Sequence, residues 1–161
     1  MKQIYTNRCQ LRNWKEKDLL DLKKIICSDK VARLAGFKAK TPDEAIPVLQ
    51  TFIQDSKKSL WAIADRKNDK AIGWLEVHRF QELGAKAYEI GYCLNESYWG
   101  KGIMPEVVCK VIKEMRESGE IDKLICSHFD HNEQSKRVIE KCGFHYYKKE
   151  NKKLYYVQNL K

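Results

Sequence analysis

The sequence predicts an α/β fold of the α+β type: a mixed, mostly antiparallel sheet of about six or seven strands flanked by about four helices. Segments with the two-residue period of strands alternate along the chain with segments at the 3.6-residue period of helices. A strand–helix–strand unit in the second half should cross over into parallel pairing, whereas short polar links favour antiparallel hairpins elsewhere. The chain of 161 residues suits one domain, over residues 1–161.

The first part of the chain predicts one strand and two main helices. Residues 4–12 alternate loosely and predict a strand. From Lys15 onward the apolar residues recur at helical spacing, which predicts a first helix, and residues 31–34 predict a short helical piece. The segment 41–44, TPDE, is a typical helix start with a cap, a proline in the first turn and a glutamate that completes a capping box. The second helix should run to about Ser56.

The rest of the chain predicts most of the sheet and two further helices. The alternating segments predict strands at residues 60–64, 71–80, 87–94 and 124–129, and a closing hairpin at 144–149 and 154–157. Broad apolar stripes predict a helix at 103–115 and another that begins at Asn132 and ends at Gly143.

Composition narrows the class of protein. Apolar residues make up 43% and charged residues 33%, and no segment reaches the run of about 18 apolar residues that spans a membrane. The N-terminal residues have no apolar core typical of a secretory signal, so we expect a cytoplasmic protein without a membrane partner. The six cysteines contain no C-x-x-C and no grouping with histidine, which predicts free, mostly buried thiols and no metal.

The net charge of +9 favours an acidic partner. Three classes of partner fit: nucleic acid, a ribosomal surface and a multiply phosphorylated cofactor. A basic nucleic-acid-binding module therefore stays an alternative. The sequence contains no RNP-like or helix-turn-helix pattern, so we expect no direct binding to nucleic acid.

The segment 88–115 is the candidate functional centre. A strand leads through Gly100-Lys101-Gly102 directly into a long amphipathic helix. This order directs free backbone N–H groups and the positive end of a helix dipole at one place, which suits a phosphate. The turn is neither a full G-x-G-x-x-G nor a G-x-x-x-x-G-K-[ST] loop, so dinucleotide and nucleoside triphosphate folds are disfavoured.

Two motifs together resemble a known family. IGYCLNESYWGKGIM resembles the acetyl-CoA-binding segment of the GNAT superfamily of N-acetyltransferases, and HNEQSKRVIEKCGF resembles its N-x-x-S-x-x-V-x-x-K-x-G-F segment. The chain is most similar to the RimJ/RimL branch, which acetylates N-terminal amines of ribosomal proteins. The resemblance implies acetyl-CoA as cosubstrate and direct attack by a primary amine, from a protein N-terminus, ribosomal or other, or from a small molecule. A non-catalytic acetyl-CoA-binding domain is a further alternative, and the protein is expected to be a monomer or a homodimer.

The resemblance also implies the cofactor-binding residues. It places the pyrophosphate on backbone amides of Trp99, Gly100, Lys101, Gly102, Ile103 and Met104. Cys93 and Leu94 occupy the end of a splayed strand, whose backbone should pair with the pantetheine arm. Asn132 should hydrogen-bond the same arm, and an ordinary helix cap is the alternative for it.

The catalytic candidates are Ser135 and Glu89. Many GNAT enzymes protonate the leaving thiolate with a tyrosine, and Ile139 occupies that position here. Ser135, one turn earlier, is therefore the candidate acid, or a residue that only binds the cofactor. Glu89 is the candidate base, with Glu76 and His78 as further options and a salt-bridged strand residue as the alternative for each.

For the part of the site that binds the acceptor amine, the sequence offers only candidate residues. Cys93 is not expected to form an acetylated intermediate, because the sequence places no histidine to activate it. Aromatic residues are candidate walls of the acceptor groove, although a place in the core or partly in the core is the favoured interpretation of each. They are Trp14, Phe37, Trp61, Trp74 and Tyr92.

Overall fold

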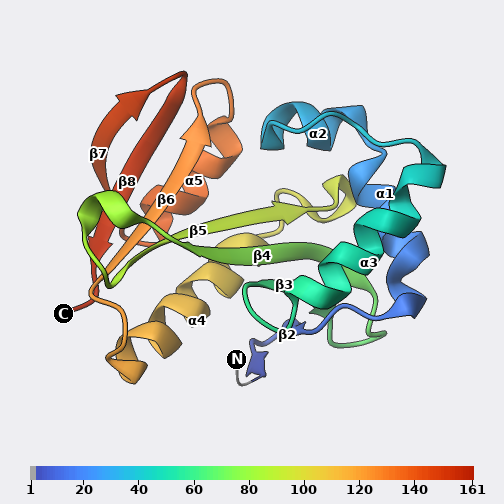
Figure 1. The fold of residues 1–161 in the computed structure, drawn as a ribbon, viewed down its shortest axis with the longest axis horizontal. Helices are drawn as coiled ribbons and strands as arrows, with labels where there is room; N and C mark the ends of the chain where they lie inside the picture. The colour runs from blue at the N-terminus through green and yellow to red at the C-terminus, as the bar shows by residue number, and fades with distance from the viewer. Residues whose placement is uncertain (1–2) are drawn as a thin grey trace. The chain divides into compact units, whose positions relative to one another are not determined.

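The computed structural model describes residues 3–161 (Figure 1). Its chain divides into two compact units. The first unit extends to Glu76 and takes in Tyr92–Ile103, and the second consists of Val77–Gly91 and Met104–Lys161. Strands β4 (Ala71–Arg79) and β5 (Ala87–Leu94) each contribute residues to both units.

The predicted fold class is confirmed. The strands follow the order β1-β2-β3-β4-β5-β6-β8-β7 in a mixed sheet. Neighbouring strands pair antiparallel in β1–β2, β2–β3, β3–β4, β6–β8 and β7–β8, and parallel in β5–β6. The described residues form eight strands and five α-helices, because the N-terminal segment forms two strands and the short helical piece is a separate helix.

The first unit places helices α1 (Leu19–Ile26), α2 (Asp29–Ala35) and α3 (Ala45–Asp55) against its strands, and α1 lies beside α3 (Figure 1). The strands of this unit are β1 (Ile4–Tyr5), β2 (Cys9–Arg12), β3 (Leu60–Asp65) and the first part of β4. Apolar faces of all these helices meet in one buried core that includes Leu22, Val31, Leu49 and Trp74. Helical periodicity found these faces because burial of an apolar stripe stabilises an amphipathic helix.

The N-terminal segment differs from the single strand expected at residues 4–12. A turn at Thr6 divides it, since the Thr6 N–H donates to the Cys9 carbonyl (2.8 Å) and the Cys9 N–H donates to the Thr6 hydroxyl (2.9 Å). The two short strands then pair with each other, with Ile4 opposite Leu11. The predicted capping box is present, because the Glu44 carboxylate accepts the Thr41 N–H at 2.7 Å, but it begins a 3-10 helix at Pro42–Glu44 and α3 follows from Ala45.

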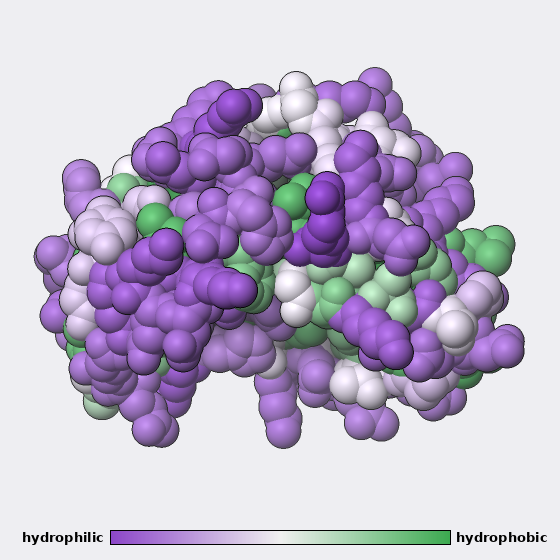
Figure 2. Space-filling view, turned by 90° about the horizontal axis from the view of Figure 1, so that it is seen from above, coloured by the Kyte–Doolittle hydropathy of each residue, from purple (hydrophilic) through white to green (hydrophobic). Residues whose placement is uncertain are grey.

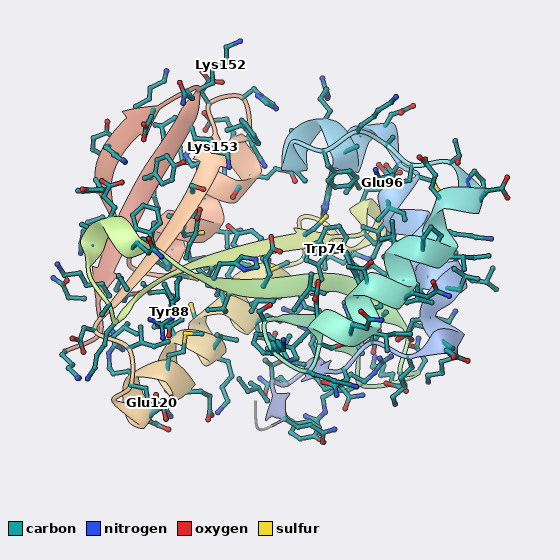
Figure 3. All side chains as sticks on the ribbon, in the orientation of Figure 1. Trp74, Tyr88, Glu96, Glu120, Lys152 and Lys153 are labelled. Carbon is teal, nitrogen blue, oxygen red and sulfur yellow. The ribbon has the colours of Figure 1, made fainter. Side chains whose placement is uncertain are left out.

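The second unit contains α4 (Ile103–Ser118, from Met104 on), β6 (Lys123–Phe129), α5 (Glu133–Lys141) and the hairpin of β7 (His145–Glu150) and β8 (Lys153–Asn159). Helix α5 packs on β6. The hairpin turns at Asn151 and Lys152, both with positive φ (50° and 65°), as a tight two-residue turn requires. Figure 3 labels Lys152 and Lys153 at this end of the hairpin.

Hydrophilic side chains cover most of the face shown in Figure 2, and apolar residues reach it only in limited areas. Across residues 3–161, none of the helices combines the length and hydrophobicity needed to cross a membrane.

In the first unit, strand β4 and the end of β5 approach each other very closely at Gly73. A Cβ atom at this position would lie 2.2 Å from the Cys93 carbonyl oxygen and 3.1 Å from the Leu94 Cα. Both obstacles are backbone atoms, which cannot rotate out of the way. Only glycine therefore allows the end of β5 to take this position beside β4.

Replacing Gly73 by alanine should destabilise the protein, because the added methyl group forces the two strands apart. Overpacking of this kind costs about 1 to 3 kcal/mol in the free energy of unfolding. For a chain of this size we expect the Tm to fall by about 2 to 12 °C in differential scanning calorimetry. Gly73→Ser should be at least as destabilising, and an unchanged Tm in both variants would show that the strands separate without cost.

Candidate functional site

The glycine-containing turn between β5 and α4 forms the first half of the candidate site. After a short 3-10 helix at Glu96–Tyr98, Gly100 and Gly102 adopt positive φ angles of 70° and 72°. A Cβ atom at Gly100 would meet nothing within 4 Å, so the backbone lies open at this point. The predicted turn is therefore present, and the long helix α4 begins directly after it, at Ile103.

The amides of this turn are available to a ligand from Gly100 onward. The Trp99 N–H donates to the Glu96 carbonyl at 3.1 Å, which removes it from the expected row of amides. Within residues 3–161, the N–H groups of Gly100, Lys101 and Gly102 make no hydrogen bond. The first N–H groups of α4, at Ile103 and Met104, have no partner inside the helix. Such a row suits a phosphate group.

Arg8 adds a cation to the turn. Its Nη1 donates to the Lys101 carbonyl at 2.8 Å, and its Nη2 lies 3.7 Å from the position a Cβ atom would take at Gly102. A guanidinium presents several N–H donors in a planar fork and binds phosphate well. Sequence reasoning missed Arg8, since 93 residues separate it from Lys101 and it belongs to no motif. Only the hairpin of β1 and β2 places it here.

The side chains at the end of β5 are not offered to a ligand. Cys93 and Leu94 are buried, at 6% and 8% exposed. The Leu94 carbonyl accepts the Trp99 Nε1–H at 2.8 Å, and the Asn95 N–H donates to the Ile72 carbonyl at 2.8 Å. These bonds hold the strand end in place. Pairing of β5 with β6 stops at Ile90 and Cys126, as the expected splayed strand pair requires.

Cys93 is not a nucleophile at neutral pH. Burial raises the pKa of its thiol to about 12, with a smaller contribution in the same direction from the Glu76 carboxylate. The thiolate is the reactive form, and its fraction at pH 7 is then on the order of 10⁻⁵. This agrees with the expectation of direct transfer without an acetylated cysteine.

Asn132 and Ser135 lie together at the start of α5, in the second unit. The Asn132 side-chain oxygen accepts the Ser135 N–H at 3.1 Å, so Asn132 is a helix cap. Its amide nitrogen is a further donor group. Ile139 is fully buried and carries no group that could transfer a proton. Ser135, half-buried one turn earlier, has a hydroxyl at this end of the helix.

Glu89 is also in the second unit, on β5. Its carboxylate accepts a hydrogen bond from the Ser127 hydroxyl at 2.7 Å. Burial, followed by the charge of Glu89, raises the pKa of Tyr155. Of the other base candidates, His78 is exposed and Glu76 is half-buried.

The predicted site residues thus form two groups. The first unit contains Cys93, Leu94 and the turn up to Ile103, with Arg8 as a new member. The second unit contains Glu89, Asn132 and Ser135, together with Met104. No group of three or more histidine, cysteine or acidic residues suited to a metal ion occurs in the described chain.

A cavity of about 350 Å³ lies in the first unit, beside β4. Of the five aromatic candidates for the acceptor groove, Phe37 and Trp74 line it. Trp14 instead packs in the core against Phe52, with ring centroids 5.3 Å apart. Trp61 is buried, and Tyr92 is half-buried.

A strand, a glycine turn with unbonded amides and a long helix thus follow one another in the chain, an order that suits an anionic cofactor. Residues 8–145 match the family described as "Acetyltransferase (GNAT) domain". The chain therefore belongs to the GNAT acetyltransferase family, whose reaction is acetyl-CoA-dependent acetylation, and the predicted superfamily is confirmed.

Individual relatives agree with this membership. YoaA of Bacillus subtilis (strain 168), named an uncharacterized N-acetyltransferase, is 28% identical over 145 residues, which cover 88% of this chain and 81% of YoaA. The crystal structure of a GNAT-family acetyltransferase from Bacillus anthracis has a TM-score of 0.84 at 21% identity, with 98% of both chains covered. RimL, described as a ribosomal L7/L12 alpha-N-protein acetyltransferase in complex with coenzyme A, has a TM-score of 0.76 at 18% identity over 98% of both chains.

Replacing Arg8 by glutamine should weaken the binding of acetyl-CoA about tenfold, because one charge-assisted phosphate contact is lost. Isothermal titration calorimetry measures this change directly. Arg66→Gln is a matched control, since Arg66 is also an exposed arginine of the first unit and donates to the Thr6 carbonyl rather than to the turn. Equal affinity in wild type and Arg8→Gln would remove Arg8 from the site.

Proposed function

We propose that the protein is an N-acetyltransferase that moves the acetyl group of acetyl-CoA to a primary amine. The amine belongs to a protein N-terminus, such as that of a ribosomal protein, or to a small molecule. The observation that carries this proposal is the turn at Gly100–Gly102, where free amides and the Arg8 guanidinium occur together in a chain of the GNAT family. RimL is named a ribosomal L7/L12 alpha-N-protein acetyltransferase, which supports a ribosomal N-terminus as one candidate acceptor for this chain.

The first unit would bind the phosphates and the pantetheine arm. Amides from Gly100 to Met104 receive the pyrophosphate, with Arg8 and Lys101 as nearby cations. Trp99 acts through its side chain, because the Nε1–H bond to Leu94 fixes the carbonyl at the strand end. The backbone of Cys93 and Leu94 is the proposed partner of the amide groups of the arm, in the manner of an added strand.

Acetyl transfer to an ammonium group removes two protons from its nitrogen, of which one is released to solvent and one is delivered to the sulfur. The ammonium loses a proton, for which Glu89 is the proposed acceptor, directly or through water. The neutral amine then attacks the thioester carbonyl carbon, so that a C–N bond forms and the C–S bond breaks. The proposed backbone N–H near Cys93 and Leu94 stabilises charge on the carbonyl oxygen. The products are the acetylated amine, the free thiol of coenzyme A and one released proton.

Ser135 is the proposed donor of a proton or hydrogen bond to the leaving sulfur. The reference pKa of a thiol, near 8.5, means that the thiolate leaves readily, so the benefit of an acid is moderate. N-terminal amines, with a reference pKa of about 7.7 to 8.0, need less help from a base than lysine at about 10.4. A site whose proposed base is a hydrogen-bonded carboxylate therefore suits an N-terminal amine better than a lysine side chain.

The proposed function is tested by adding acetyl-CoA with and without amines. Saturation at 100 times the Kd should stabilise the fold by about 2.7 kcal/mol, seen as a rise in Tm. A panel of peptides with free N-termini and small amines should then release the thiol of coenzyme A, with the acetylated product found by mass spectrometry. Binding without thiol release from any amine would instead indicate a non-catalytic domain, and no thermal shift would reject the cofactor itself.

Replacing Ser135 by alanine should lower kcat on the order of 100-fold, the lower end of the effect of a general acid, with the Kd of acetyl-CoA nearly unchanged. Gln134→Ala is the matched control, because Gln134 is the exposed neighbour on α5. Steady-state kinetics with the best acceptor of the panel measures both variants. Wild-type turnover in Ser135→Ala would exclude a catalytic role for this serine.

A further inference from the structure

The cavity in the first unit has an apolar wall. Six apolar side chains line it, contributed by α1, α3, strands β3 and β4, and the segment after α2. They are Ile26, Phe37, Val48, Phe52, Leu60 and Trp74. An apolar cavity of about 350 Å³ falls in the range of small-molecule sites, which bind mainly by burying hydrophobic surface.

The aromatic part of this wall is held by ring contacts. The Trp74 and Phe52 rings meet edge to face, with centroids 5.3 Å apart, and the Phe37 ring lies 6.1 Å from Trp74. Figure 3 labels Trp74 on β4, and Phe52 reaches it from α3. Packed rings have few alternative rotamers, so the cavity is preformed for an apolar group, aromatic or branched.

Two charged side chains also line the cavity, and they have opposite signs. Glu76 follows Trp74 by two residues on β4, so both side chains lie on the same face of the strand. Lys40 lies on the segment before α3, and its backbone N–H donates to the Ile26 carbonyl at 2.8 Å. The Glu76 carboxylate would attract the ammonium group of an acceptor amine. The Lys40 ammonium would repel an acceptor that carries a second positive charge.

Glu76 also connects the cavity with the end of β5. Trp74 and Cys93 belong to the same buried core cluster, and Gly73 directly before Trp74 touches the Cys93 backbone. Glu76 follows Gly73 by three residues on the same strand, and its charge contributes to the raised pKa of the Cys93 thiol. An amine at Glu76 would therefore be next to the backbone that the proposed function assigns to the thioester arm.

We propose that the acceptor is a primary amine with a bulky apolar group beside its amino group and without a second positive charge. Its apolar group occupies the cavity, and its ammonium group is positioned by Glu76. This inference rests on the proposed N-acetyltransferase activity and narrows its substrate class. The reaction is the transfer given above: the amine loses two protons in all, one to solvent and one to the thiol, and gains the acetyl group.

Two kinds of molecule could carry such an amine: a peptide with a free N-terminus and a small free amine. The experiment has one arm for each kind. The first arm compares tetrapeptides X-Ala-Ala-Ala with X as Phe, Leu, Ser or Gly. The second compares 2-phenylethylamine with ethanolamine and spermidine. We expect kcat/KM to be at least tenfold higher for the bulky apolar member in one arm or both, because burial of such a side chain is worth that factor or more. The arm with the larger values identifies the source.

Thr51→Trp tests the cavity itself. Thr51 lines the cavity but is exposed, so a tryptophan can fill the space from outside without disturbing the core. The variant should lose at least tenfold in kcat/KM for the apolar acceptor and keep the Kd of acetyl-CoA. Gln50→Trp is the matched control, because Gln50 is the exposed neighbour on α3 and is not among the cavity-lining residues. Circular dichroism and Tm confirm that both variants fold.

Binding supplies a readout that does not depend on turnover. Calorimetry should detect 2-phenylethylamine or Phe-Ala-Ala-Ala in the presence of coenzyme A, and Glu76→Gln should weaken this binding about tenfold. Equal kcat/KM for polar and apolar acceptors, or an unchanged preference in Thr51→Trp, would overturn the inference and leave the acetyltransferase activity intact. The absence of a thermal shift with acetyl-CoA would instead reject the proposed function. In that case, calorimetric binding of the amines to the cavity would still show whether the site prefers bulky apolar groups.

Discussion

The contact between Gly73 and the Cys93 carbonyl is the constraint on which the candidate site depends. It brings the end of β5 against β4 so closely that no side chain fits between them. Two hydrogen bonds then fix the strand end, from the Asn95 N–H to Ile72 and from the Trp99 side chain to Leu94. The peptide groups at this end are consequently held by backbone packing, and the turn at Gly100–Gly102 starts from a defined position.

In the proposed cofactor site, backbone groups rather than side chains would make most of the contacts. Cys93 and Leu94 are buried, and the two glycines supply conformation rather than chemistry. Burial of Cys93 also makes its thiol unreactive, which leaves direct attack by the amine as the simplest route. The charged groups that distinguish this site, Arg8 at the turn and Glu76 at the cavity, come from outside the motif.

The sequence predicted the elements with regular apolar patterns well. The α4 stripe, the strands β3 to β6 and the closing hairpin follow their expected ranges, because hydrophobic period and turn residues decide such elements locally. The turn and its glycines were also found. Arg8 was not, because its position depends on the split of the N-terminal strand by Thr6, and no periodicity signals that turn. The Trp99 N–H donates to the Glu96 carbonyl, so the row of unbonded amides begins at Gly100. This hydrogen bond is visible only in the folded structure.

The cavity proposed to bind the acceptor likewise could not be predicted from local sequence patterns, because it depends on tertiary packing. Phe37 and Trp74 were among the five aromatic candidates and line the cavity. Trp14 was an equal candidate in the sequence but lies in the core, and only tertiary packing decides between the two positions. Phe52, Val48 and Lys40 belong to a helix and a loop that gave no functional signal of their own. Val48 and Phe52 reach the cavity because α3 packs on β3 and the Phe52 ring meets the Trp74 ring of β4.

We propose that the turn at Gly100–Gly102 binds the phosphates of acetyl-CoA. Calorimetric titration with acetyl-CoA and with S-acetylpantetheine, which has the same thioester arm but lacks the phosphates and the adenosine, measures the contribution of the phosphate-bearing half of the cofactor. We expect acetyl-CoA to bind at least about 100-fold more tightly than S-acetylpantetheine, because several charge-assisted hydrogen bonds are lost with the phosphates. Equal affinity for the two compounds would contradict it.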